Sequence, residues 1–258
     1  MTDLPALLPA PLPALLPARL PALLPARLQG DIAPANAAEA AILSRRAVRG
    51  FLPTPIDRAD IEHLLDVAAR APSGTNMQPW RAIALAGEPL DSFREALAQA
   101  ALDGSETEAR DYQYYPDPFF EPYQARRRKI GWDLYGHLGI GRGETAKMRA
   151  QMAHNLRFFG APVGLVCVID RRLEIGSWID YGMFLQNIAI AARARGLDTC
   201  HMAIFAQFPG TIRRLLGLDT SEVIVCGVAI GHEDPDAPAN RLRTERVPAA
   251  GFTDFRGF

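Results

Sequence analysis

The chain has 258 residues, 48% of them hydrophobic and 22% charged, which is ordinary for a globular protein with a sizeable buried core. Its formal net charge of −1 argues against a nucleic acid or a membrane surface as the main partner. Three scattered cysteines without a CxxC pair argue against a disulfide framework. The sequence contains no HExxH motif, which argues against a zinc site. We therefore expect a cytoplasmic protein in which Cys167 and Cys226, each inside an apolar run, are buried strand thiols.

The N-terminus is a low-complexity tract. Residues 4–28 repeat Leu, Pro and Ala, with a proline every two to four residues. Proline at that spacing removes helix hydrogen bonds, which excludes a spanning helix and does not fit a signal peptide. We expect residues 1–36 to form a disordered tail rich in Pro, Leu and Ala. A tail that docks a partner, and an upstream start codon with the working protein beginning near Asp31, remain alternatives.

The remaining chain alternates helical and strand patterns. The first helix is expected at 37–46, and Asp57 is expected to cap a second whose apolar face carries Ile61, Leu64, Leu65 and Ala68. A loop then follows at 72–80. Further helices are expected at 89–102, 124–137, 144–159, 177–195 and 209–216, and extended segments at 81–86, 163–169, 197–205 and 223–230. Residues 103–123 read as irregular and 231–258 as an arm without its own core. This pattern indicates an α/β or α+β domain at 37–258 and leaves the strand order open.

Three polar segments are candidates for chemistry. Arg45, Arg46 and Arg49 follow the first helix; guanidinium groups match phosphate geometry, although neighbouring arginines are more often a solvated face. The loop PSGTNMQPW places Asn76 and Gln78, which both donate and accept hydrogen bonds, beside a tryptophan, and its alternative is an ordinary turn. The third segment, NRLRTER at 240–246, is either functional or a solvated basic tail.

Several common motifs are absent. No GxGxxG follows a strand, and neither GxxxxGK[ST] nor GxSxG occurs. The sequence therefore disfavours a Rossmann dehydrogenase and a serine hydrolase.

In combination, these segments resemble the nitroreductase family of flavoproteins. SRRAVRGF is similar to the family's S-R-R-S-x-R signature, and APSGTNMQPW to its A-P-S-x-x-N-x-Q-P-W loop. WIDYGMFLQNIAIAARARGLDTC resembles its long central helix followed by Gly-Leu-x-Thr, and GHEDPDAPANRLRTERVP its C-terminal segment. The resemblance covers roughly residues 40 to 255.

The resemblance implies an α+β fold in which a mixed or antiparallel sheet is flanked by helices, within an intertwined homodimer that binds FMN without a covalent bond. Arg45, Arg46 and Arg246 would hold the phosphate and ribityl end, and Arg49 would lie beside the ring's pyrimidine as electrostatic support. Flavin N5 would carry the hydride, with no side chain acting as the catalyst. The other cofactor-binding residues implied are Ala47, Ser73, Asn76, Gln78, His201, Met202, Ala203 and Arg243.

The resemblance further implies ping-pong transfer of hydride from NAD(P)H to a small aromatic acceptor, a nitroarene or a quinone. Ala47 stands where the family often has serine, and Ala203 offers no hydroxyl to N5, which favours two-electron reduction. Residues 112–142 correspond to the variable segment that covers the substrate, where Arg126, Arg127 and Arg128 would attract a carboxylate or form a solvated basic turn. Another reaction on the same scaffold (dehalogenation, ene reduction or flavin fragmentation) and a non-enzymatic flavin-binding or partner-binding protein remain alternatives.

Overall fold

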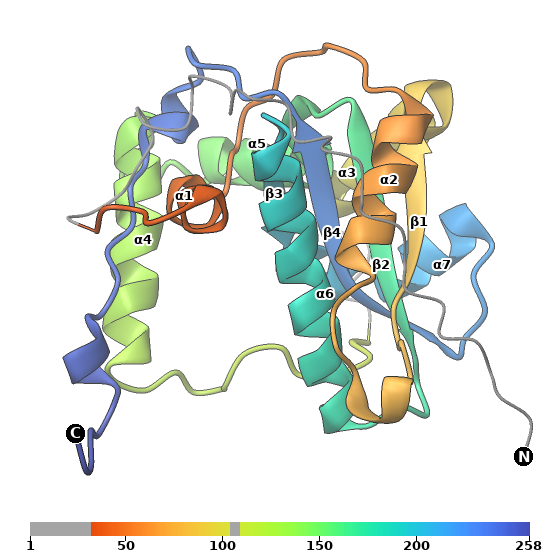
Figure 1. Cartoon of the computed structure of the whole chain (residues 1–258). Helices are drawn as coiled ribbons and strands as arrows, with labels where there is room; N and C mark the ends of the chain where they lie inside the picture. The colour runs from red at the N-terminus through yellow and green to blue at the C-terminus, as the bar shows by residue number, and fades with distance from the viewer. Residues whose placement is uncertain (1–31, 104–108) are drawn as a thin grey trace, which may run out of the picture.

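A computed structural model describes residues 32–103 and 109–258 (Figure 1). Most of the predicted tail therefore lies outside the described residues.

Four strands form one antiparallel sheet in the order β1-β2-β4-β3. Their bounds are β1 Arg81–Ala86, β2 Val163–Asp170, β3 Asp198–Met202 and β4 Glu222–Gly231. Edge strand β3 pairs with residues 227–231 of β4, and its Thr199 also forms an isolated parallel bridge with Ala47. The first half of β4 is instead approached by the segment around Tyr112, whose hydroxyl donates to the Val225 carbonyl at 3.0 Å. Because the register of β4 against β2 shifts at this point, Val225 sits in a bulge that leaves its carbonyl available.

Helices cover both faces of the sheet (Figure 1). Their bounds are α1 Ala37–Ser44, α2 Arg58–Ala68, α3 Gly87–Asp103, α4 Tyr123–His137, α5 Thr145–Leu156, α6 Ile175–Ala194 and α7 Pro209–Leu216. One core lies between the sheet and α2 and α6, and a second lies between the sheet and α3, α5 and α7. Strands β2 and β4 are buried on both faces, which explains their nearly continuous apolar sequences.

A short 3₁₀ helix, η4 (Ala203–Gln207), follows β3 directly. Its Phe205 is fully buried and rests on Gly227 of β4, where an added Cβ would lie 2.8 Å from the phenyl ring. Any side chain at residue 227 would push η4 away from the sheet. This close approach fixes where the chain turns after β3.

Most predicted elements are confirmed, and three expectations need correction. The first helix ends at Ser44 rather than residue 46, because Arg45 adopts an extended backbone with ψ of 134°. Asp57 is the N-cap residue of α2, but its side chain makes no capping hydrogen bond. The extended segment expected at 197–205 ends at Met202, where η4 begins. Cys167 and Cys226 are buried strand thiols, as predicted, and the structure places them opposite each other on β2 and β4.

Helix α4 and the C-terminal arm stand apart from this core. Figure 1 shows them running beside each other, with α1 between them and the sheet. No residue of α4 is buried, and every residue from 243 to 258 is exposed. Residues 243–258 of the arm therefore contribute no buried side chain to a core.

Candidate functional site

Two cavities meet beside the segment that follows α1. The first, about 420 Å³, lies at the end of β3 and is called here the strand-end cavity. The second, about 840 Å³, lies between α4, the arm and the segment after α1, and is called the basic cavity. Arg49 and Tyr115 line both cavities, so the two spaces adjoin at these side chains.

The basic cavity carries a large excess of positive charge. Its lining contains two acidic side chains, Asp133 and Glu245, and eight basic ones: Arg45, Arg46, Arg49, Arg126, Arg127, Lys129, Arg243 and Arg246. Burial, and then the nearby charge of Arg246, lower the pKa of the Arg45 guanidinium. Like charges that approach each other inside a partly buried cavity indicate an anion-binding site.

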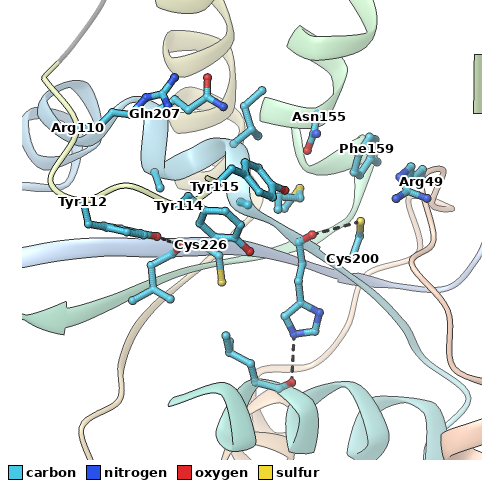
Figure 2. Close-up of a pocket in the computed structure, with 17 residues that line it drawn as sticks. Arg49, Arg110, Tyr112, Tyr114, Tyr115, Asn155, Phe159, Cys200, Gln207 and Cys226 are labelled. Atoms are coloured by element: carbon cyan, nitrogen blue, oxygen red, sulfur yellow. Dashed lines mark hydrogen bonds between the residues drawn. The ribbon is translucent and has the colours of Figure 1, made fainter. Parts of the chain in front are cut away.

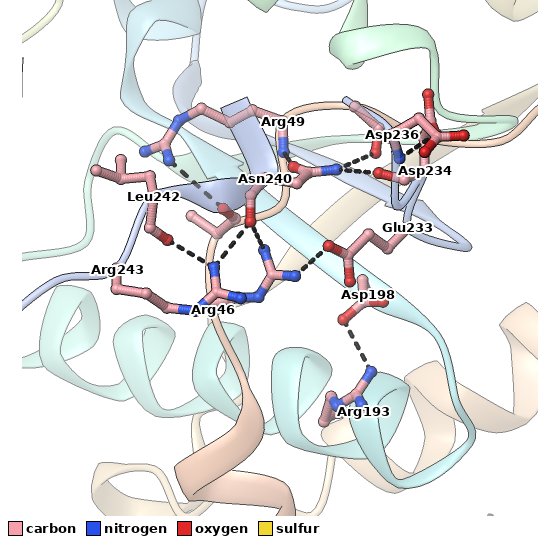
Figure 3. A network of polar contacts seen from close by, with 12 residues as sticks. Arg46, Arg49, Arg193, Asp198, Glu233, Asp234, Asp236, Asn240, Leu242 and Arg243 are labelled. Atoms are coloured by element: carbon pink, nitrogen blue, oxygen red, sulfur yellow. Dashed lines mark hydrogen bonds and ion pairs between the residues drawn. The ribbon is translucent and has the colours of Figure 1, made fainter. Parts of the chain in front are cut away.

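Arg46 has a different environment from its neighbour Arg45. Its guanidinium forms a buried ion pair with Glu233 and donates to the Asn240 carbonyl at 2.8 Å (Figure 3). Both terminal nitrogens are thus engaged within the protein, although Arg46 still borders the basic cavity. The structure assigns Arg46 first to joining the segment after α1 to the start of the arm.

Asn240 is the centre of that junction, and sequence reasoning did not single it out. Its Oδ1 accepts from the Arg49 amide at 2.7 Å, and its Nδ2 donates to the carbonyls of Gly50 and Asp234 at 2.8 and 2.9 Å. Its own carbonyl accepts from Arg243 at 2.8 Å (Figure 3). Gly50 permits this approach, because a Cβ there would lie 2.4 Å from the Ala237 Cβ. The network sets the positions of Arg49 and Arg243 relative to each other.

The strand-end cavity is bordered by β3 and the first turn of η4. His201, Met202 and Ala203, which the family resemblance implied as cofactor-binding residues, all line it. The His201 ring, however, contacts α6, where its Nε2 lies 3.1 Å from the Leu185 carbonyl. Burial lowers the pKa of His201 to about 4, so the neutral ring donates this hydrogen bond at pH 7. His201 therefore offers the cavity its backbone rather than its imidazole.

Asn155, at the end of α5, lines the strand-end cavity and was not predicted (Figure 2). Its Oδ1 is buried and has no hydrogen-bond partner among the described residues. Such an atom carries a desolvation cost that a bound ligand with a donor group would remove. The sequence could not identify Asn155 as a candidate ligand contact. Its burial in the cavity that Arg49 and Phe159 also line marks it as one, and that burial is visible only in the structure.

Tyrosines form another wall of the strand-end cavity. Tyr112, Tyr114 and Tyr115 line it, and the rings of Tyr114 and Tyr115 meet edge to face at 4.6 Å (Figure 2). Asp111 fixes the start of this segment by accepting from both Arg171 and Arg213 at 2.6 Å. The part of the variable segment from 112 to 115 therefore forms one wall of the strand-end cavity.

The loop at 72–80 is not brought to these cavities within one chain. Ser73, Asn76 and Gln78 line neither cavity, and the loop is tied to α6 by a hydrogen bond from the Gly74 amide to Asp180 at 3.0 Å. Asn76 and Gln78 are exposed and have positive φ angles of 60° and 49°. Non-glycine residues rarely hold this conformation, and such strain concentrates at functional sites.

The described residues provide no group of three or more metal-ligating side chains, and none of their helices is both long and apolar enough to cross a membrane. The groups that line the two cavities are arginine guanidinium groups, amides and tyrosine rings. These groups fit an anionic, aromatic cofactor or ligand.

Comparisons with known proteins agree with this geometry. The model of the nitroreductase family matches residues 42–232. A 4-nitrobenzoate reductase of Pseudomonas putida is 44% identical over 220 residues, covering 85% of this chain and 96% of the relative. The solved FMN and NADPH-dependent nitroreductase NfnB of Sphigopyxis sp. strain HMH superposes with a TM-score of 0.82 at 38% identity, covering 86% of this chain and 99% of that one.

The FMN-dependent nitroreductase NfnB of Mycobacterium smegmatis, solved in complex with NADPH, gives a TM-score of 0.81 at 30% identity and covers 85% of this chain and 98% of that one. These neighbours share the antiparallel sheet flanked by helices, so the predicted α+β fold is confirmed. The match extends over most of both chains in each case. The chain belongs to the nitroreductase family.

Proposed function

We propose that this chain is an FMN-dependent oxidoreductase that passes hydride from NAD(P)H to nitroaromatic or quinone-like acceptors. The observation that carries the proposal is the pair of adjoining cavities, one rich in arginine and one bordered by backbone and aromatic rings. A mononucleotide with a flat ring needs both environments. Relatives named as nitroarene reductases, and neighbours named as FMN and NADPH-dependent, support the same activity.

The basic cavity fits the phosphate end of FMN. Arg45 lies close enough to Arg246 for their charges to interact, and Arg243 approaches from the arm. Guanidinium groups donate two parallel hydrogen bonds to phosphate oxygens, which would offset the repulsion among them. Arg46 and Asn240 would hold the cradle in shape, and Ala47 would contribute backbone only.

The strand-end cavity fits the ring. Arg49 stands where the two cavities adjoin and would place positive charge beside the pyrimidine, stabilising negative charge that develops there. The buried Oδ1 of Asn155 would accept from the ring's N3–H. The Ala203 amide, at the turn that Phe205 fixes, would donate to N5.

FMN supplies the two-electron carrier between NAD(P)H and the acceptor when it is bound. The protein's own part is to bind, orient and cover the reactants. Tyr112, Tyr114 and Tyr115 would stack on the aromatic acceptor and exclude water. Ala203 provides no side-chain hydroxyl at N5, which favours two-electron over one-electron reduction.

A homodimer would complete the site. The loop with Ser73, Asn76 and Gln78 is strained, exposed and remote from the arginines of its own chain, so a second copy would supply it. Ile175 and Ile179 on α6 are 77% and 63% exposed, and the arm exposes Phe252 and Phe255 at 72% and 61%. These apolar surfaces are what an intertwined partner would cover.

The test is anaerobic spectroscopy of the purified protein. Yellow protein that NADPH bleaches, and that regains its colour on addition of 4-nitrobenzoate with formation of reduced product, supports the proposal. Flavin that NADPH leaves oxidised would favour a flavin-binding protein without this activity. Turnover of a halogenated or ene acceptor in preference to nitroarenes and quinones would indicate another reaction on the same scaffold.

A further inference from the structure

Three consecutive arginines, Arg126, Arg127 and Arg128, lie near the start of helix α4, which begins at Tyr123. All three side chains are exposed, but Arg126 and Arg127 line the basic cavity, whereas Arg128 lines neither that cavity nor the strand-end cavity. All three side chains carry the same charge, but only two of them line the cavity. Arg128 therefore serves as a control that distinguishes a specific role of Arg126 and Arg127 from a general effect of positive charge.

The charges of Arg126 and Arg127 are poorly compensated. The first turn of α4 contains no acidic residue, and the positive charge of Arg126 near the helix N-terminus opposes the helix dipole. Across the described chain, neither side chain forms an ion pair; the cavity's carboxylates, Asp133 and Glu245, pair instead with Lys129. An arrangement that is unfavourable for the helix alone suggests that an anionic ligand compensates it.

Aromatic rings lie beneath these guanidinium groups. The Arg127 guanidinium lies 4.4 Å from the centre of the Phe119 ring, and that of Arg126 lies 5.8 Å from the centre of the Tyr123 ring. Phe120 packs edge to face on Tyr123 at 5.1 Å, and both remain more than half exposed. A guanidinium stacked on a ring keeps its in-plane N–H donors available, so an anion can bind at its edge while an aromatic body rests on exposed rings.

This cluster is distinct from the phosphate cradle. Arg45, Arg243 and Arg246 come from the segment after α1 and from the arm, whereas Arg126 and Arg127 come from α4. A single phosphate of about two negative charges does not require all of these arginines. The cavity thus has cationic groups to spare after the cofactor phosphate is bound.

We propose that Arg126 and Arg127, with Phe119, Phe120 and Tyr123, form a second anion subsite for an aromatic ligand that bears an anionic group. The inference rests on the proposed function, whose reactants include two such ligands. One is a nitroarene acceptor with a carboxylate, and the other is NADPH through its adenosine 2′-phosphate. The subsite thereby selects either the acceptor or the coenzyme.

The experiment compares the Arg126→Gln/Arg127→Gln double variant with an Arg128→Gln control, both loaded with FMN. Equilibrium binding of benzoate and of adenosine 2′-monophosphate is followed by the change in flavin absorbance or fluorescence. We expect at least one probe to bind about tenfold more weakly to the double variant, as loss of charge-assisted hydrogen bonds implies. The Arg128→Gln control should bind both probes as the wild type does, and FMN retention should be equal in all three proteins.

A matched kinetic experiment identifies the ligand. Selective loss of kcat/KM for 4-nitrobenzoate over nitrobenzene assigns the subsite to the acceptor carboxylate, and loss of the preference for NADPH over NADH assigns it to the 2′-phosphate. The proposal is overturned if the wild type binds neither probe, if both probes bind the double variant as well as the control, or if the double variant loses FMN. Probe binding without reduction of any nitroarene or quinone would reject the proposed function but leave the subsite intact.

Discussion

At the scale of single residues, the sequence and the structure assign different roles to neighbouring side chains. Arg45 and Arg46 are chemically identical in the sequence, but only Arg46 has a buried carboxylate, Glu233, to pair with. His201 was expected at the cofactor, and its ring is bonded to α6 instead. Asn155 was not identified from the sequence as a residue of the site. Local sequence does not specify which way a side chain points, because that depends on which distant segment lies beside it.

We expect the Asn155 side chain to lower the stability of the FMN-free protein and to strengthen FMN binding. Asn155→Leu should raise the free energy of unfolding of the FMN-free protein by about 1 kcal/mol, because an unpartnered buried oxygen is removed. The same change should weaken FMN binding by about tenfold. Chemical denaturation and flavin titration measure the two effects.

The matched control is Asn187→Leu on α6. Its Nδ2 donates to the Ala68 carbonyl at 3.2 Å, so its loss should destabilise the protein and leave FMN affinity unchanged. If Asn155→Leu destabilises the protein as Asn187→Leu does, with unaltered FMN affinity, Asn155 has no ligand-binding role.

His201 makes stability depend on pH. Its pKa is lowered to about 4, against about 6.5 in an unfolded chain, so the unfolded state binds more protons between these values. The contribution is fully present above about pH 6.5 and is lost as the pH falls toward 4. From pH 7 to pH 5, the wild type should lose about 2 kcal/mol more stability than His201→Gln, which keeps a donor for Leu185. Urea unfolding at both pH values measures this difference, and parallel losses in the two proteins would refute it.

At the scale of elements, pattern reasoning succeeded where burial is two-sided or strongly periodic. The bounds of β1 and α7 agree with those predicted, and β2 and β4 differ by a residue at one or both ends. It failed where tertiary contacts decide the backbone, as at Met202, where packing of Phe205 on Gly227 ends the strand. The pairing of β3 with only half of β4 was equally invisible in the sequence, because strand order was left open.

The covering segment depends on one carboxylate. Burial alone would raise the pKa of Asp111, but hydrogen bonds from Arg213 and Arg171 outweigh it and leave that pKa below its usual range. Asp111→Asn should release the tyrosines, raise KM for aromatic acceptors several-fold and leave FMN affinity unchanged. Steady-state kinetics provide the measurement.

Asp170→Asn is the control for that change, since Asp170 pairs only with Arg172 in an adjacent exposed turn among the contacts described for it. It should leave KM unaltered. Equal KM values for Asp111→Asn and wild type would show that the tyrosines do not depend on Asp111 for their position.

At the scale of the whole molecule, the segments of the family signature lie in two places within one chain. The loop at 72–80 lines neither of the two cavities that the arginines border. Under the proposed function, association of two chains would bring these segments together, and the exposed apolar residues of α6 and the arm are consistent with that association. The sequence indicated which segments matter, and the structure shows which of them one chain brings together.

Disrupting association should therefore release the cofactor. Ile179→Asp on α6 is expected to yield monomers in light scattering and to lower FMN occupancy by at least about tenfold, because charge is costly in an apolar interface. Ser92→Asp, on the exposed face of α3 across the sheet, should remain dimeric and yellow. A monomeric Ile179→Asp protein with full FMN affinity would mean that the site is complete in one chain.

The most direct test of the central claim, that the converging arginines bind the phosphate of one flavin mononucleotide, compares FMN with riboflavin. The FMN-free wild type should bind FMN at least about a hundredfold more tightly than riboflavin, since only FMN offers charge-assisted hydrogen bonds to several guanidinium groups. Arg45→Gln and Arg246→Gln should each remove about tenfold of that preference without changing riboflavin affinity, whereas Arg256→Gln, near the end of the same arm, should change neither. An undiminished preference for FMN in the Arg45 and Arg246 variants would contradict the account.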